Sequence, residues 1–206
     1  LSKKKKLTIV PSQNEQGASL AADAYYRVSG KLGVVVVTSG PGAINSLQGL
    51  ACSFYDSIPS LYITGAPVTK ALKKNQNLRQ LGFQEMEIKK IVSSFTKYAV
   101  RITDVKKISY EIDKCVYLSQ SGRPGPCLID IPDDIQRMDT NLREQKKFYN
   151  LKSKIFLNQK HVQKTTEMIK KSKKPVFVIG YGVKISKNIS GIKKLLKNTT
   201  ELPKNY

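Results

Sequence analysis

The chain of 206 residues has no tryptophan, a single histidine and only three cysteines. Cys52, Cys115 and Cys127 show no metal-ligand spacing, and each lies in an apolar stretch. We therefore expect them to be small core residues in a reducing, cytoplasmic compartment. The histidine, His161, stands in a lysine-rich stretch with no chemical partner nearby, so we expect it at the surface. No metal site is predicted in this chain.

Long hydrophobic runs are also absent. A membrane-spanning helix needs about 20 apolar residues, and the longest candidate here is Gly33–Val37. The sequence therefore predicts no membrane partner. Its first residue is Leu1 rather than Met, which favours a processed chain or one cut from a longer protein.

Arginine is scarce among the basic residues. Of 36 Lys and Arg residues only 6 are Arg, although the formal net charge is +21. Arginine dominates the bidentate recognition of phosphates and guanine, and no alternation of basic and aromatic residues is visible. The lysines are spread along the chain and are densest after Lys146. This pattern predicts a solvated basic surface rather than a nucleic-acid partner.

Apolar, β-branched runs alternate with longer amphipathic stretches as far as about Pro132. The runs predicted as strands are residues 7–10, 33–38, 61–64, 98–102 and 126–131. The stretches predicted as helices are residues 16–28, 43–55, 86–93 and 105–119. The strand runs are almost continuously apolar, as in strands that are buried on both faces. This alternation predicts an α/β fold, a layered parallel sheet with helices on both faces.

The composition also predicts a division into parts. Residues 1–136 form the first domain, the polar stretch 137–158 a linker, and residues 159–206 the start of a second α/β unit. A helix-like run at 162–171 and a strand-like run at 174–182 open that unit, which the remaining residues are too few to complete. Within the first domain, the polar stretch 68–82 is a candidate lid or binding loop.

Glu15 and the turn Gly40-Pro41-Gly42 each follow a predicted strand. If these strands are parallel neighbours, the carboxylate and the turn lie side by side at the edge where α/β sheets bind ligands. Ser12 and Glu15 also fit a capping box, with Ser12 as N-cap and Glu15 at N3. The turn is common in purely structural roles, and it lacks the GxGxxG and GxxxxGK[ST] patterns of phosphate sites. The residues alone leave both interpretations open.

Five motifs in one order carry a family resemblance. They are Asn14-Glu15-Gln16-Gly17-Ala18, Thr38-Ser39-Gly40-Pro41-Gly42 with Asn45, Asp56-Ser57-Ile58-Pro59, Phe83-Gln84-Glu85 and Ser121-Gly122-Arg123-Pro124-Gly125-Pro126. Together they resemble the pyrimidine-binding domain of thiamine-diphosphate enzymes, above all acetolactate synthase and acetolactate-synthase-like proteins. The resemblance covers about residues 7–136 and, more faintly, residues 174–182, which are similar to the start of the family's central domain.

The resemblance implies roles for these residues. Glu15 would be catalytic, because the family's glutamate hydrogen-bonds N1′ of the aminopyrimidine and favours its imino tautomer. Thiamine diphosphate would supply the electron sink for decarboxylation of a 2-keto acid. The implied cofactor-binding residues are Thr38, Gly40, Pro41, Gly42 and Asn45. Phe83 and Gln84 would lie on the substrate side, with ordinary loop packing as the alternative, and Lys97 is not expected to be catalytic.

The resemblance also implies partners. The family's cofactor lies between two subunits, so a homodimer or homotetramer is expected. Mg2+ and the diphosphate would be bound by a C-terminal domain with a Gly-Asp-Gly…Asn-Asn pattern, which these residues lack. FAD is left open. The activity of these residues alone is expected to be nil.

Two departures leave the substrate open. Asn14 stands where the family usually has histidine, and residues 78–82 look more like a branch associated with surface-sugar pathways than like biosynthetic acetolactate synthases. The alternatives are a sibling decarboxylase or carboligase of a sugar or envelope pathway, and a non-catalytic binding module with the same fold.

Overall fold

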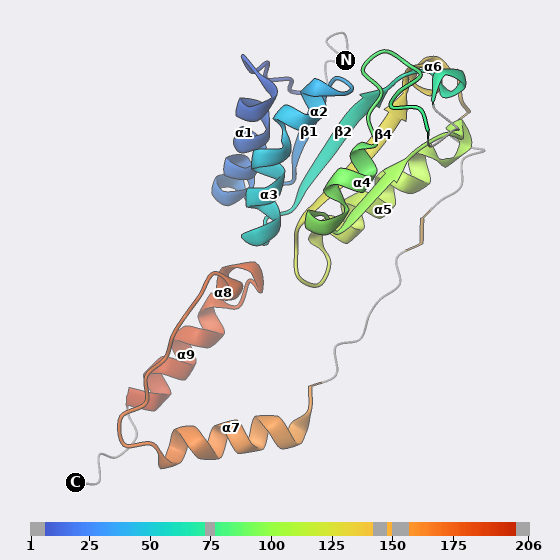
Figure 1. Cartoon of the computed structure of the whole chain (residues 1–206). Helices are drawn as coiled ribbons and strands as arrows, with labels where there is room; N and C mark the ends of the chain where they lie inside the picture. The colour runs from blue at the N-terminus through green and yellow to red at the C-terminus, as the bar shows by residue number, and fades with distance from the viewer. Residues whose placement is uncertain (1–6, 73–76, 142–147, 150–156, 201–206) are drawn as a thin grey trace. The chain divides into compact units, whose positions relative to one another are not determined.

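Four apolar runs pair into one parallel sheet. They are β1 (Gly33–Val37), β2 (Ser60–Ala66), β3 (Tyr98–Arg101) and β4 (Pro126–Pro132), in the spatial order β1-β2-β4-β3 (Figure 1). The computed structural model describes residues 7–72, 77–141, 148–149 and 157–200. The chain divides into two compact units, Leu1–Asn150 with the sheet and Leu151–Tyr206.

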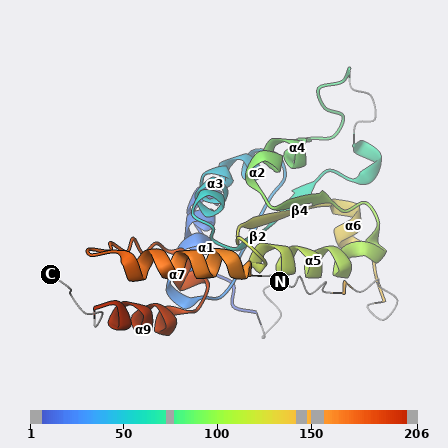
Figure 2. The same ribbon diagram turned by 90° about the horizontal axis from the view of Figure 1, so that it is seen from below.

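Helices cover both faces of the sheet, as Figure 2 shows from below. On one face lie α1 (Glu15–Ser29), α2 (Pro41–Asn45), α3 (Leu47–Tyr55) and α4 (Ile88–Val92). On the other face lie α5 (Ile108–Gln120) and α6 (Asp133–Arg137). The described part of this unit also contains three short 3-10 helices: η1 (Thr69–Ala71), η2 (Ser93–Phe95) and η3 (Val105–Lys107). The predicted α/β fold is therefore confirmed.

The hydrophobic core has two parts, one on each face of the sheet. The buried residues of the first part are Ala22, Val35, Val37, Ala43, Leu50, Tyr62, Ile88, Val92 and Leu128. Those of the second part are Leu61, Ile102, Cys115, Cys127, Ile129, Ile131 and Ile135. Because β2 and β4 contribute to both parts, these central strands are buried on both faces, as their continuous apolar sequence predicts.

Edge strand β1 departs from that prediction. Val35 is 2% and Val37 8% exposed, whereas Val34 is 52% and Val36 57% exposed. Since successive side chains of a strand point to opposite faces, only one face of β1 is covered by helices among the described residues. Its apolar run is therefore buried on one side only.

The predicted strand at residues 7–10 is not formed. Leu7 is 55%, Ile9 48% and Val10 78% exposed, and none of these residues joins the sheet. A β-strand is stable only when a neighbour satisfies its backbone N–H and C=O groups. In the described part of the chain, β1 pairs with β2 alone. The strand propensity of residues 7–10 therefore finds no partner.

Close backbone contacts fix helix α1 against its neighbours. A Cβ placed on Gly33 of β1 would lie 2.4 Å from the Ala22 carbonyl oxygen, and one placed on Gly49 of α3 would lie 2.4 Å from Ser19 Oγ. Only glycine permits approaches of this kind. These two contacts bring α1 onto both β1 and α3.

The stretch predicted as one helix over residues 43–55 is interrupted. Ser46 separates α2 from α3, and its hydroxyl donates to the Ala43 carbonyl at 2.7 Å. Serine competes in this way for backbone acceptors and so disfavours helix interiors. The break leaves the Gly40-Pro41-Gly42 turn on a helix of its own, of only five residues.

In the second unit the described elements are helices α7 (Gln159–Lys171), α8 (Gly182–Ile185) and α9 (Ile189–Thr200). The strand predicted within residues 174–182 is wrong: residues 175–180 have no regular structure, and Val176 and Val178 are 87% and 95% exposed. No described strand lies in this unit to pair with them. Hydrophobicity without a pairing partner is again insufficient to form a strand.

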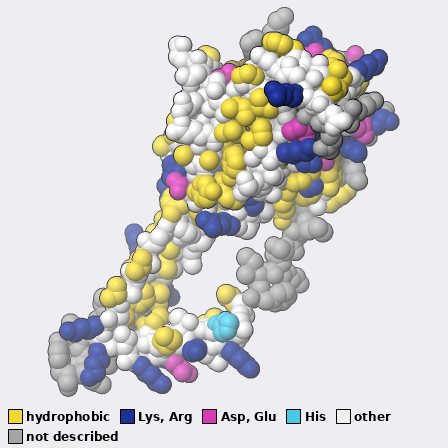
Figure 3. All heavy atoms as spheres, in the orientation of Figure 1, with side chains coloured by type: hydrophobic (Ala, Val, Ile, Leu, Met, Phe, Trp, Pro, Cys, Tyr) yellow, Lys and Arg dark blue, Asp and Glu magenta, His cyan; other side chains and the backbone are white. Residues whose placement is uncertain are grey.

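Three further sequence predictions concern the surface. His161 is exposed on α7, as expected, and the histidine atoms are visible in Figure 3. Cys115 and Cys127 are buried as predicted, but Cys52 is exposed, because the buried side of α3 is formed by Gly49, Leu50 and Ser53. Among the described residues, no helix has both the length and the apolar character needed to cross a membrane.

Candidate functional site

Glu15 is the first residue of helix α1. The N-cap is Asn14, whose extended backbone (φ −151°) precedes the helix and whose Oδ1 accepts a hydrogen bond from the Gly17 amide at 2.7 Å. The capping box with Ser12 as N-cap and Glu15 at N3 is therefore wrong. Asn14 satisfies one of the free N–H groups of the helix N-terminus, which leaves the Glu15 carboxylate available for other contacts.

The Glu15 carboxylate lies beside the Gly-Pro-Gly turn. Asn45 Nδ2 donates to Glu15 Oε2 at 3.2 Å, and a Cβ placed on Gly42 would lie 3.2 Å from Oε1. The pKa of Glu15 is lowered, first by a hydrogen bond from its own backbone N–H and then by the Asn45 amide. The predicted juxtaposition thus exists, although the strand expected before Glu15 does not. Packing of α1 on β1 and α3 provides it instead.

The turn itself requires small residues. Gly40 has a φ of +59°, a conformation that side chains with a Cβ rarely adopt. Pro41 is the first residue of α2, where its fixed φ and missing N–H suit a helix start. A Cβ on Gly42 would also lie 2.6 Å from Thr38 Cγ2. Four of the predicted residues therefore lie in one tightly packed turn: Thr38, Gly40, Pro41 and Gly42.

The Phe83–Gln84 segment, about 40 residues later in the sequence, contacts the same turn. A Cβ on Gly40 would lie 2.6 Å from the Gln84 carbonyl oxygen and 2.9 Å from Gln84 Cβ. Gln84 also has a positive φ, +56°, which is uncommon outside glycine and is found where surrounding structure enforces it. Phe83 is 83% exposed. The structure thus brings Gln84 to the turn and leaves the Phe83 ring in solvent.

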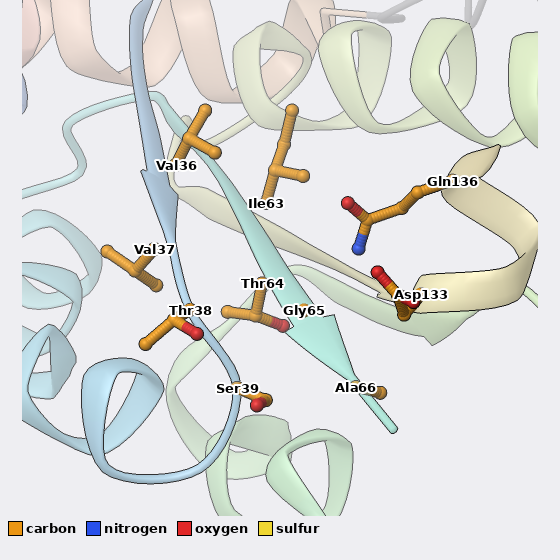
Figure 4. A pocket seen from close by; sticks show the side chains of 10 residues that line it. All are labelled: Val36, Val37, Thr38, Ser39, Ile63, Thr64, Gly65, Ala66, Asp133 and Gln136. Carbon is orange, nitrogen blue, oxygen red and sulfur yellow. The ribbon is translucent and has the colours of Figure 1, made fainter. Parts of the chain in front are cut away.

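A pocket of about 220 Å³ lies at the carboxyl ends of β1, β2 and β4. Figure 4 shows its lining: Val36, Val37, Thr38, Ser39, Ile63, Thr64, Gly65, Ala66, Asp133 and Gln136. Among the residues predicted from sequence only Thr38 lines it. The predicted set therefore surrounds the Gly-Pro-Gly turn, and Thr38 alone is shared between that turn and the pocket.

A charged network at this edge was not predicted. Arg101 Nε donates to Asp130 Oδ2 at 2.6 Å, and Thr64 Oγ1 donates to Asp130 Oδ1 at 2.8 Å. Asp130 is fully buried; its burial raises the pKa of its carboxyl, which the hydrogen bonds and charge of Arg101 oppose. The available signal was a pair of opposite charges near the ends of two predicted strands, which are register partners in the sheet.

Two other segments have structural contacts. The Lys97 ammonium donates a hydrogen bond to the Ser121 carbonyl. This contact does not test the expectation that Lys97 is not catalytic. In the polar stretch 68–82, Asp134 accepts hydrogen bonds from the Thr69 amide at 2.9 Å and from its hydroxyl. Residues 73–76 of the candidate lid lie outside the described residues.

The first part of the chain matches a known protein family. Residues 1–91 match the family described as thiamine pyrophosphate enzyme, N-terminal TPP binding domain. This segment contains Glu15, the Gly-Pro-Gly turn, Asn45 and the Phe83–Gln84 segment.

Three curated proteins illustrate the wider similarity. The chloroplastic acetolactate synthase of Arabidopsis thaliana is 36% identical over 174 residues, 82% of this chain and 25% of that protein. The acetolactate synthase isozyme 2 large subunit of Escherichia coli (strain K12) is 32% identical over 187 residues, 91% and 33%. The acetolactate synthase large subunit of Lactococcus lactis subsp. lactis (strain IL1403) is 34% identical over 182 residues, 86% and 30%. The chain thus spans a quarter to a third of the length of these relatives.

Proposed function

Since the chain belongs to the thiamine pyrophosphate enzymes through an N-terminal domain like that of acetolactate synthases, we propose that it holds the aminopyrimidine of thiamine diphosphate. The enzyme containing it would decarboxylate a 2-keto acid and join the product to an acceptor carbonyl. The observation that carries this proposal is the Glu15 carboxylate, held by Asn45 against Gly42.

The residues at the turn fit a flat heteroaromatic ring. Glycine at positions 40 and 42 lets Gln84 and Glu15 pack closely on the turn, and the Glu15 carboxylate is the acceptor for a ring nitrogen that carries a proton. The lowered pKa of Glu15 keeps the carboxylate ionised near neutral pH in the ligand-free chain. Asn45 holds Oε2 in place, and the carboxylate would take the ring proton.

When bound, thiamine diphosphate supplies the electron sink that makes loss of carbon dioxide from a 2-keto acid feasible. The contribution of this chain is positional and electrostatic. Glu15 would accept and return a proton at the pyrimidine nitrogen, and the turn would set the plane of the ring. Gln84, in contact with Gly40, would shape the adjoining space for the keto acid.

The described residues do not fit Mg2+. No three of their His, Cys, Asp or Glu side chains gather into a group that could hold a metal ion. We propose that Mg2+ and the diphosphate are bound elsewhere in the complete enzyme and that the cofactor lies between two protomers of a homodimer or homotetramer. Light scattering on the complete protein tests this assembly. A monomer that turns over substrate would contradict the proposal.

A direct test is thiazolium C2 proton exchange in the complete protein, followed by NMR with thiamine diphosphate and Mg2+. Glu15→Gln keeps the shape of the side chain but cannot take the proton, so exchange should fall by about 10²–10⁴, the range for a positioned proton-transfer group. Gln48→Ala, which alters an exposed amide on the neighbouring helix α3, is the control. Normal exchange in Glu15→Gln would sink the proposed role.

Calorimetry distinguishes the parts of the proposal. The 206-residue chain alone should not bind thiamine diphosphate with micromolar affinity, because its described residues hold no cluster of His, Cys, Asp or Glu that could bind the Mg2+ of the diphosphate. Cofactor binding by the complete protein without turnover of any 2-keto acid would favour the non-catalytic binding module instead.

A further inference from the structure

Arg101 connects the sheet to a loop that the proposed function uses. The residue ends β3, and its side chain is 15% exposed. On the sheet side, Arg101 Nε donates to Asp130 Oδ2 at 2.6 Å; Arg101 and Asp130 are register partners of neighbouring strands. The Asp130 side chain is only 1% exposed. This ion pair is therefore shielded from water and set in place by the backbone of two paired strands.

On the loop side, the same guanidinium contacts the segment before α4. Arg101 Nη2 donates to the Met86 carbonyl at 2.7 Å, and Nη1 lies 3.6 Å from Glu87 Oε1. An arginine can make these contacts together because its donors are arranged in a rigid planar fork. One side chain thus bridges a buried carboxylate and the main chain two residues after Gln84.

The loop between these points is under constraint. Gln84 has a φ of +56°, and its carbonyl lies against Gly40. Glu85 Oε2 accepts a hydrogen bond from the Leu81 amide at 2.7 Å. A non-glycine residue in the left-handed region costs free energy and persists only when its neighbours enforce it. The hydrogen bond of Arg101 to Met86 is such an enforcing contact.

We propose that Arg101 is a positioning residue, which uses Asp130 as its anchor to hold the Phe83–Gln84 segment against the Gly40 turn. Its catalytic consequence rests on the proposed function, because that function puts Phe83 and Gln84 on the substrate side. The alternative is a purely structural role, in which Arg101 only neutralises the charge of the buried Asp130. A lysine separates these roles, since one ammonium on a flexible stem can pair with Asp130 but does not reproduce the fork.

Hydrogen–deuterium exchange of the 206-residue chain tests the positioning role without any cofactor. The readouts are the amides of Glu85, which donates to Gly82, and of Lys90 and Ile91, which donate to Glu87. In Arg101→Lys these amides should exchange about tenfold faster, as for loss of one charge-assisted hydrogen bond in a local opening. Amides of β4 should keep their protection. Rates at the three amides within a factor of two of wild type would overturn the role.

A second variant is needed in case Arg101→Lys disturbs the fold as a whole. Arg101→Met combined with Asp130→Asn removes both charges at similar volume, so no unpaired charge is buried. It should show the same accelerated exchange as Arg101→Lys, and normal exchange would again overturn the role. The matched control is Arg123→Lys: Arg123 donates to Ser57 Oγ at 2.8 Å and to the Tyr55 carbonyl, so its loss should leave the Glu85–Ile91 segment unchanged.

Kinetics of the complete enzyme test the consequence. Arg101→Lys should raise KM for the 2-keto acid severalfold while thiazolium C2 exchange, which depends on Glu15, stays near normal. An equal loss of C2 exchange would contradict a role limited to the substrate side. If the complete protein shows no thiamine-diphosphate chemistry, the proposed function fails, whereas the amide exchange still decides whether Arg101 holds the loop.

Discussion

Asn45 and Glu15, thirty positions apart in the sequence, are joined by a hydrogen bond of 3.2 Å from Nδ2 to Oε2. The bond links the last residue of α2 to the first residue of α1. It joins the carboxylate to the helix that carries the Gly-Pro-Gly turn.

Asn45→Ala should raise the pKa of Glu15 toward its ordinary value of 4.5 without fully reaching it. The Asn45 amide is the second cause of the lowered pKa, and the backbone N–H of Glu15, the larger cause, remains. NMR titration of the Glu15 side-chain carbonyl measures this pKa. Gln48→Ala is the control, and an unchanged pKa in Asn45→Ala would show that the hydrogen bond is not formed in solution.

The same shift implies a pH dependence of stability. A carboxyl whose pKa is lower in the folded chain than in the unfolded chain stabilises the fold fully above the unfolded pKa. That contribution is lost as the pH falls below about 4.5 and through the folded pKa. Urea unfolding of wild type and Glu15→Gln at several pH values should therefore converge in acid. Parallel curves from pH 7 to pH 3 would contradict the lowered pKa.

Gly40→Ala should destabilise the fold more than Gly30→Ala does. Both glycines have positive φ, but Gly30 (φ +69°, ψ 9°) is in the left-handed helical region, where a Cβ costs about 1–2 kcal/mol, whereas Gly40 (φ +59°, ψ −113°) lies outside it in a conformation still less open to alanine. Only at Gly40 would the new Cβ meet the Gln84 carbonyl oxygen, at 2.6 Å, whereas the space beside Gly30 is open within 4 Å. The difference in unfolding free energy therefore reports the extra backbone strain at Gly40 together with the contact with Gln84. Equal losses would contradict the close packing and strained backbone of the Gly40 turn.

Arg27→Met should cost about 1–2 kcal/mol, because Asp23 is buried and would lose a charged partner. Arg27 Nε lies 2.5 Å from Asp23 Oδ1, and Nη2 lies 2.6 Å from Asp56 Oδ2. These hydrogen bonds raise the pKa of Arg27. Arg137→Met breaks a similar pair four residues apart that is exposed at both ends, and should cost no more than about 0.5 kcal/mol. Denaturant unfolding compares the two, and equal costs would contradict the role of burial.

The sequence predicted elements well where two conditions held together, an apolar run and a partner. Central strands β2 and β4 and helices α1 and α5 satisfy both. Residues 7–10 and 175–180 have the apolar run alone, and pairing is a property of the whole fold that no local pattern contains. Propensity at these segments was therefore overridden by the absence of a neighbour within the described residues.

For the site, the resemblance located the residues but not their contacts. The meeting of Glu15 with Gly42 depends on the close approach of α1 to Gly33 and Gly49, which sequence spacing does not reveal. The start of α1 shows the same limit. A local pattern predicted Ser12 as N-cap, whereas the N-cap is Asn14, two residues later. Arg101 was missed because its partners, Asp130 and Met86, belong to other elements.

The exposed face of β1 allows a matched pair of variants at adjacent positions. Val35→Thr places a hydroxyl in a site that is 2% exposed, where no partner is provided, and should cost about 1–3 kcal/mol. Val34→Thr makes the same chemical change at a site that is 52% exposed and should stay within about 0.5 kcal/mol of wild type. Because threonine and valine have similar shape and β-propensity, the difference between the two unfolding free energies reports burial alone. A large cost at Val34 would mean that this face of the edge strand is covered in solution.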